Sequence, residues 1–178
     1  GHNLNEKSTK GGTMKRRSLI LLGLFVALAI VLSGFGTVFA GETYKLGLSL
    51  AITGPTSDAG NPYAKGVEDY FRYVNETKML GDDKIDCTIR DDQYKTDVTK
   101  RNFEEFLDME IVFYLNYSTG STLALKKDFE EEQMPTIPAS FHAGNLVDSN
   151  YIFLPIASYS AQAIGLAEYV VKHHQGDA

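Results

Sequence analysis

The sequence predicts an α/β fold, in which a mainly parallel sheet carries helices on both of its faces. From residue 44 onward, short apolar runs of strand length alternate with longer segments that have helical spacing. The clearest unit is Ile111–His142, which reads as an apolar run, a polar turn, a helical segment and a second apolar run. Strands that alternate with helices run parallel through right-handed crossovers, so this order predicts a parallel sheet.

The predicted strands are short, and most of them are rich in apolar residues. In the first of them, Leu46, Leu48 and Leu50 alternate with small residues. Apolar runs of this length between turn residues are typical of strands. We expect strands at Tyr44–Ile52, Lys84–Arg90, Ile111–Leu115, Met134–Pro138 and Tyr151–Leu154.

The predicted helices repeat apolar residues every three or four positions. The first follows a loop rich in Gly and Pro, Thr53–Pro62, and Pro62 fits its first turn. Thr96 is expected to cap the second helix, since Asp97 lies in the first turn. We expect helices at Tyr63–Lys78, Thr96–Met109, Ser121–Glu132 and Ser160–His173.

The first forty residues are not expected to belong to the fold. Residues 1–13 are polar and read as a cloning scar or a misassigned upstream start. Residues 14–40 form a basic stretch, an apolar run at Leu19–Leu32 and small residues before Ala40. This pattern predicts a secretory signal peptide that is cut after Ala40, and the alternative is an uncleaved anchor. One domain at 41–178 would remain.

The charge of residues 41–178 argues against a nucleic-acid partner. Five of the 17 Lys and Arg and one of the 23 acids precede residue 41, which leaves 12 basic and 22 acidic residues, a formal charge of −10. Such an acidic chain is a poor nucleic-acid binder, so we expect no nucleic-acid partner. Cys87 is the single cysteine and lies in a predicted strand, where we interpret it as a small core residue.

Two strand ends predict one small-molecule site. Tyr117–Gly120 and Ala139–His142 follow neighbouring predicted strands and are rich in hydroxyl-bearing and small residues. Ligands of open α/β sheets lie beyond the carboxyl ends of the strands, so we expect these segments to form the two halves of a site. The first segment could instead be a simple helix start, with Ser118 or Thr119 as the N-cap.

Other chemistries have weaker signals in the sequence. Asp91-Asp92 resembles a pair of catalytic carboxylates, but no nucleophile–base pair or phosphate loop accompanies it. His142 lacks neighbours at metal-ligand spacing, and the T-G-P loop is not a dinucleotide fingerprint. We therefore expect a binding protein without metal, cofactor or enzymatic activity.

Four motifs in order give the sequence a family resemblance. They are T-G-P in Leu46–Pro55, R-D-D at Arg90–Asp92, Y-S-T-G at Tyr117–Gly120 and P-T-I-P-A-S at Pro135–Ser140. In this order and spacing, the sequence resembles the type I periplasmic solute-binding proteins, in particular the branched-chain amino-acid and amide binding subunits of ABC importers. The resemblance implies two α/β lobes that close on a ligand, a transporter permease as partner, and no enzymatic activity.

The resemblance also implies the ligand contacts. The hydroxyl of Thr119, with Ser118 beside it, would hold the carboxylate or amide end of an amino acid, amide or small carboxylate. Ser140 and His142 would hold the opposite polar end, although the family usually has Ser or Thr where His142 stands. Tyr63 would supply the aromatic wall.

Members of this family are about twice as long. Residues 41–178 are therefore expected to form an incomplete N-terminal ligand-binding lobe, and the second lobe is expected to be missing. The sensor domain of a membrane receptor with the same fold is the alternative function.

Overall fold

The computed structural model describes residues 21–23, 25 and 41–174. The chain divides into two units, residues 1–39 and 40–178, and in the first unit only the described residues 21–23 and 25 are assigned, as helix. The predicted upstream tail and nearly all of the predicted signal peptide lie outside the described residues, so cleavage after Ala40 stays a prediction. Among the described residues, no helix combines the length and the apolar character needed to cross a bilayer.

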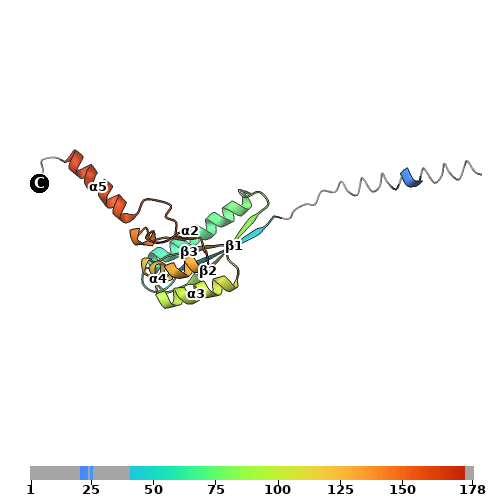
Figure 1. The fold of residues 1–178 in the computed structure, drawn as a ribbon, viewed down its shortest axis with the longest axis horizontal. Helices are drawn as coiled ribbons and strands as arrows, with labels where there is room; N and C mark the ends of the chain where they lie inside the picture. Colours follow the sequence, from blue (N-terminus) through green and yellow to red (C-terminus); the bar gives the residue numbers. More distant parts are fainter. Residues whose placement is uncertain (1–20, 24, 26–40, 175–178) are drawn as a thin grey trace, which may run out of the picture. The chain divides into compact units, whose positions relative to one another are not determined.

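The second unit is built on one parallel sheet of four strands (Figure 1). The strand order is β2-β1-β3-β4, with β1 paired to both β2 and β3. This arrangement confirms the predicted parallel sheet. The strands are β1 (Thr43–Leu50), β2 (Lys84–Asp91), β3 (Phe113–Asn116) and β4 (Thr136–Pro138).

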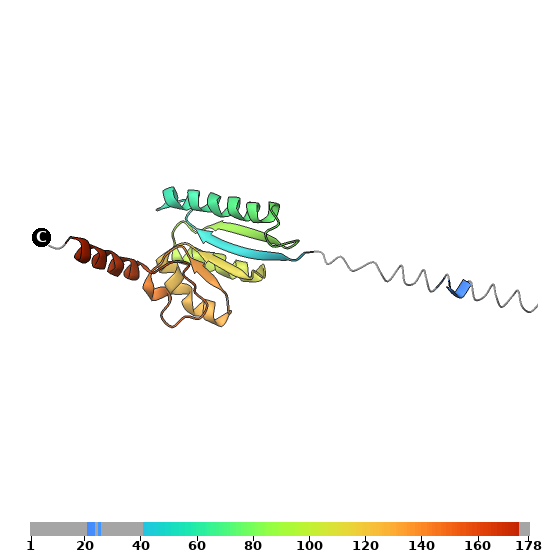
Figure 2. The ribbon, with the colours of Figure 1, turned by 90° about the horizontal axis from the view of Figure 1, so that it is seen from above.

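Helices cover both faces of this sheet, as the sequence predicted. Figure 2 shows α2 (Ser57–Glu76) on one face and α3 (Thr96–Asp108) on the other. The helix α4 (Thr119–Glu131) packs beside α3, and a short 3-10 turn, η1 (Ala143–Asn145), lies against α4. The last helix, α5 (Tyr159–His173), has no buried residue.

The predicted start of α2 was wrong by six residues. The helix begins at Ser57, so Pro62 lies inside it and not in its first turn. Gly60 explains the earlier start, because a Cβ on this residue would lie 1.9 Å from the carbonyl oxygen of Ala51. Glycine therefore lets the first turns of the helix lie directly against the end of β1. The sequence had predicted a loop, Thr53–Pro62, for this part of the chain.

Two further expectations were wrong. Thr96 does not cap α3, because Lys95 holds the N-cap position and its side chain makes no capping bond. The predicted strand at Tyr151–Leu154 is reduced to a single bridge between Ile152 and Thr136. This segment enters the sheet for one residue and then turns toward α5.

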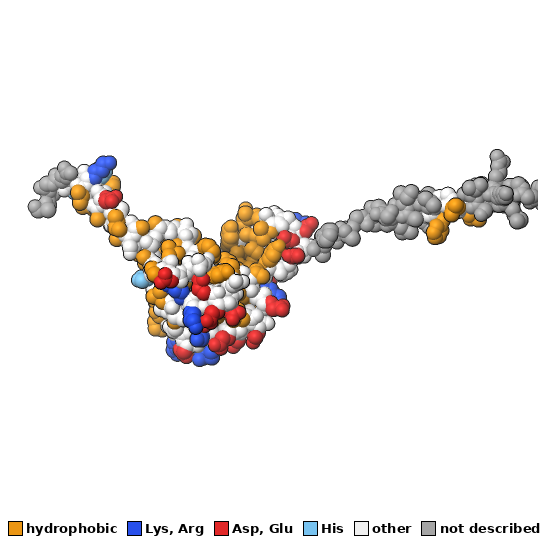
Figure 3. Space-filling view, viewed as in Figure 1, with side chains coloured by type: hydrophobic (Ala, Val, Ile, Leu, Met, Phe, Trp, Pro, Cys, Tyr) orange, Lys and Arg blue, Asp and Glu red, His pale blue; other side chains and the backbone are white. Residues whose placement is uncertain are grey.

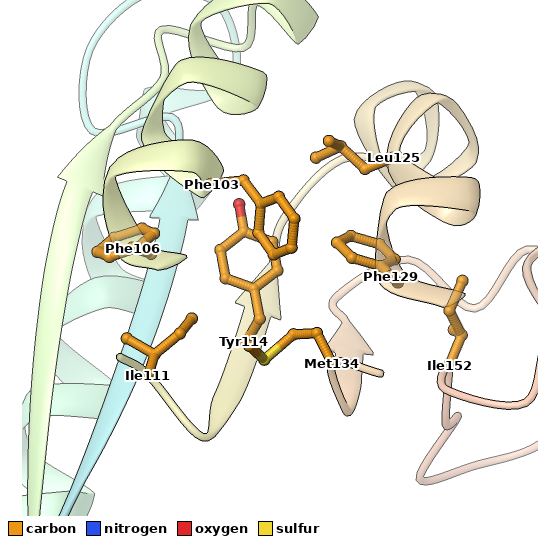
Figure 4. Close-up of a cluster of buried hydrophobic side chains, with 8 residues drawn as sticks. All are labelled: Phe103, Phe106, Ile111, Tyr114, Leu125, Phe129, Met134 and Ile152. Atoms are coloured by element: carbon orange, nitrogen blue, oxygen red, sulfur yellow. The ribbon is translucent and has the colours of Figure 1, made fainter. Parts of the chain in front are cut away.

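Two apolar clusters form the core, one on each face of the sheet. The larger cluster fills the space between β3, α3 and α4, and Figure 4 shows its aromatic rings facing one another. The rings of Phe103 and Tyr114 lie 5.0 Å apart, and those of Phe103 and Phe129 lie 5.1 Å apart. The smaller cluster lies under α2 and includes Leu48, Leu50, Ala64 and Leu115.

The outer surface of α2 also carries apolar side chains. Tyr70 and Tyr73 are each more than half exposed, and Figure 3 shows hydrophobic side chains gathered over this helix. Cys87 of β2 is partly buried under α2, and burial raises the pKa of its thiol to about 11. The thiol is therefore protonated at neutral pH, which agrees with its interpretation as a small core residue.

Asp92, the residue after β2, lies inside a buried polar network. Its carboxylate accepts hydrogen bonds from Tyr94 N–H (2.8 Å), from the Thr99 hydroxyl (3.0 Å) and from the Ser49 hydroxyl (3.4 Å). Its side chain is fully buried, and this burial outweighs the hydrogen bonds and raises its pKa above the ordinary value of 3.8. The folded protein therefore favours the protonated form more than the unfolded chain does.

This raised pKa predicts a pH-dependent gain of stability in Asp92→Asn. A raised carboxyl pKa contributes stability that is present below the unfolded pKa and lost as the pH rises through the folded pKa. The neutral amide does not lose it, so the melting temperature of Asp92→Asn relative to wild type should rise between pH 3 and pH 7. Thermal melting at both pH values measures this difference, and a constant difference would contradict the prediction.

Candidate functional site

The carboxyl ends of the strands meet at one edge of the sheet, and a cavity of about 210 Å³ opens there. It contains three of the five residues that the sequence predicted for the site: Ser118, Thr119 and Ser140. The complete lining is Thr56, Tyr94, Tyr117, Ser118, Thr119, Ala139, Ser140 and Tyr159. The two predicted halves, after β3 and after β4, therefore lie against the same cavity.

Ser118 serves the start of α4. Its hydroxyl oxygen accepts the N–H of Ser121 at 3.1 Å, which is the N-cap bond that the sequence offered as the structural alternative. The hydroxyls of Ser118 and Ser121 are also paired, at 2.6 Å, and Ser121 contacts the fully buried amide of Asn116. This network fixes the turn between β3 and α4.

Thr119 is the first residue of α4 and directs its hydroxyl at the opposite side of the cavity. The Thr119 hydroxyl is hydrogen-bonded to the hydroxyl of Ser140, which follows β4. The N–H groups of Ser121 and Thr122 are accepted by Ser118, whereas those of Thr119 and Gly120 have no acceptor within the helix. A helix start with such groups favours a negative or carbonyl end of a ligand.

The segment after β4 is held by the buried side chain of Asn145, whose amide donates to the carbonyl oxygen of Ser140 at 2.9 Å. His142 is exposed and does not line the cavity. Its Nδ1 accepts the N–H of Gly144 at 3.1 Å, which caps the 3-10 turn. His142 thus has a local structural role, and its predicted ligand contact stays a prediction.

Tyrosines form the remaining walls. Tyr94 and Tyr117 meet edge to face, with ring centroids 6.2 Å apart. Tyr159 reaches the cavity because its N–H donates to the carbonyl oxygen of Phe141 at 2.9 Å. Tyr63 lies behind this wall, 6.1 Å from the ring of Tyr117, and burial raises the pKa of its hydroxyl. Its predicted direct contact with a ligand also stays a prediction.

Five lining residues were not among the predicted site residues. Tyr117 and Ala139 belong to the two predicted segments, and Thr56 belongs to the T-G-P loop, so the sequence carried a signal for these three. Tyr94 follows the end of β2 and could have been found by the same strand-end argument. Tyr159 gave no signal, because its place depends on the path of the chain after β4.

The cavity can bind a small polar molecule by neutral groups. Its lining has three kinds of side-chain group, aliphatic hydroxyls, phenols and a methyl group, and contains no Asp, Glu, Lys, Arg or His. Among the described residues, no group of three or more His, Cys, Asp or Glu is placed to hold a metal ion. A charged end of a ligand would therefore be held by hydroxyls and by the start of α4.

Comparison with known proteins decides the family. Residues 43–178 match the family described as periplasmic binding protein. The chain belongs to this family. No curated protein matches the sequence significantly. The family match over residues 43–178 confirms the resemblance inferred from the four motifs.

Solved structures of binding proteins share the fold. A branched-chain amino acid ABC transporter protein from Thermus thermophilus with bound valine is 45% identical, with a TM-score of 0.70, and the match covers 78% of this chain and 37% of that one. A substrate-binding protein of an ABC transporter from Aeropyrum pernix is 31% identical, with a TM-score of 0.68, over 75% of this chain and 36% of its own.

A more distant binding protein has the same fold. The solute-binding protein of an ABC transporter from Rhodopseudomonas palustris, in complex with 3,4-dihydroxybenzoic acid, is 19% identical, with a TM-score of 0.60, and the match covers 73% of this chain and 36% of that one. The chain thus spans well under half the length of these solved structures.

Proposed function

We propose that this chain is part of the extracytoplasmic solute-binding subunit of an ABC importer, and that it binds an amino acid, an amide or a small carboxylate. The cavity at the strand ends carries this proposal, because hydroxyls from two neighbouring strand ends meet there at the start of a helix. The permease of the importer would be its protein partner. The signal sequence predicted at residues 14–40 supports export.

The proposed ligand pose follows from the geometry. A carboxylate or carbonyl oxygen would replace the Thr119–Ser140 contact and accept from the Thr119 hydroxyl and from the first N–H groups of α4. The tyrosines would cover the apolar part of the ligand. Ser140 and a second lobe would supply the other wall, since the cavity is open and the relatives are longer.

A branched-chain amino acid is the first ligand to test, because the relative from Thermus thermophilus was solved with valine. Calorimetric titration of the full-length protein with L-valine should show saturable binding. L-valinamide, which lacks the carboxylate, should bind more weakly than L-valine if the start of α4 receives that group. Absence of heat with L-valine, isobutyramide and 3,4-dihydroxybenzoate would contradict the proposed ligand classes.

A further inference from the structure

The carboxylate of Asp91 joins two loops that the sequence separates by about forty residues. One of its oxygens accepts the N–H groups of Ile52 (3.0 Å) and Thr53 (3.1 Å), which follow β1. The same oxygen accepts the N–H of Gln93 (3.0 Å), which follows β2. The other oxygen accepts the Thr53 hydroxyl at 2.5 Å. All four donors therefore belong to the loops after β1 and β2.

The loop after β2 adopts a backbone that needs such support. Gln93 and Tyr94 have φ angles of +53° and +60°, in the left-handed region that costs free energy for residues other than glycine. The N–H of Gln93 is held by Asp91, and the N–H of Tyr94 is held by Asp92 at 2.8 Å. Each aspartate therefore fixes the residue two positions after it, in the Asx-turn pattern.

The two loops also touch directly. Gly54 has a φ angle of +78°, and a Cβ on it would lie 3.0 Å from the carbonyl oxygen of Gln93. Two residues beyond Gly54, Thr56 lines the cavity, and Tyr94 lines it from the other loop. The distance between these two walls thus depends on how the loops are joined.

We propose that Asp91 is a positioning residue for the ligand cavity, which sets Thr56 and Tyr94 by holding the loops after β1 and β2 together. This inference rests on the proposed function for its effect on ligand affinity. Asp91 makes no contact with the cavity itself, because its lining does not include this residue. It differs from a catalytic carboxylate, since its oxygens are engaged by the donors of the two loops.

The charge of Asp91 agrees with this role. Burial raises the pKa of its carboxyl, but the hydrogen bonds from Thr53, Gln93 and Ile52 outweigh that effect and hold the pKa below its ordinary value. Asp91 is therefore ionised at neutral pH, and hydrogen bonds to a charged acceptor are stronger than those to a neutral one.

A tryptophan reporter tests the loop positions without any ligand. The chain contains no Trp, so Tyr94→Trp places a single indole on the cavity wall. In that background, Asp91→Ala should shift the emission to the red and lower its anisotropy, because the loop loses its anchor. Asp91→Asn, which keeps an acceptor oxygen for the three N–H groups, should preserve both signals. Asp86→Ala, at an exposed position of the same strand, should also preserve them.

Affinity for L-valine, measured with Tyr94 in place, tests the effect on the site. Asp91→Ala should raise Kd by roughly tenfold or more, whereas Asp91→Asn should stay within about threefold of wild type. If Asp91→Ala melts below the working temperature, Thr53→Val, which removes only the hydroxyl donor, should produce smaller changes in the same direction.

The outcomes separate this inference from the proposed function. Unchanged emission and unchanged Kd in a folded Asp91→Ala, or in Thr53→Val when Asp91→Ala is unfolded, would overturn the positioning role while the binding function stands. A changed emission in a protein that binds none of the tested ligands would support the joined loops and overturn the proposed ligands. Equal losses in Asp91→Ala and Asp91→Asn would also overturn the positioning role of Asp91, because the Asn side chain keeps an acceptor oxygen in the same place.

Discussion

Phe129→Ala should lower the free energy of unfolding by about 3–5 kcal/mol, the range for removing a buried aromatic ring from a well-packed core. Phe129 is fully buried and lies between α4 and β3 in the larger core cluster. Its ring centroid lies 5.1 Å from that of Phe103 and 5.7 Å from that of Tyr114, so its loss removes two aromatic contacts from the cluster. Figure 4 shows that the neighbouring side chains come from several elements. Because surrounding structure relaxes only in part around a deleted core side chain, we expect a cavity to remain.

Urea denaturation of the chain, followed by circular dichroism, measures this loss. Leu123→Ala provides the control on the same helix, because Leu123 is 41% exposed and should cost less than about 1 kcal/mol. Phe129→Leu should fall between the two variants. Equal midpoints for Phe129→Ala and Leu123→Ala would show that this cluster does not determine stability.

The fold was predictable because its signals are local. Most strands contain a short apolar run. The alternating Leu46, Leu48 and Leu50 are buried in the structure, and Phe103 and Phe106, at helical spacing, belong to the larger core cluster. The start of α2 was not predictable in this way. It depends on the approach of Gly60 to the backbone of Ala51, a contact that no sequence period encodes.

The site was predictable at the level of strand ends and not at the level of each side chain. Parallel strands bring their carboxyl ends to one edge, so Thr119 and Ser140 could be expected to lie together. The direction of His142 was decided by one local bond to the N–H of Gly144, which spacing cannot show. Tyr94 also follows a strand end, but its exact place on the cavity wall depends on two left-handed residues and on the carboxylates that support them.

Thr119→Val should weaken ligand binding about ten- to a hundredfold, which corresponds to roughly 1.5–3 kcal/mol for one hydrogen bond to a charged group. Valine keeps the shape of threonine but removes its hydroxyl, so the bound oxygen of the ligand would lose a donor. The first N–H groups of α4 remain, and they explain why binding should be weakened and not abolished. In the ligand-free protein the variant also loses the contact between residue 119 and Ser140.

A matched control separates this loss from a general effect on helix starts. Thr96 is likewise the first residue of a helix, α3, and it is exposed and does not line the cavity. Calorimetric titration of the full-length protein with L-valine should show the loss in Thr119→Val and wild-type affinity in Thr96→Val. Ser140→Ala should weaken binding in the same direction as Thr119→Val, since its hydroxyl faces the same space. Wild-type affinity in Thr119→Val, together with a lower melting temperature, would mean that the hydroxyl only joins α4 to the segment after β4.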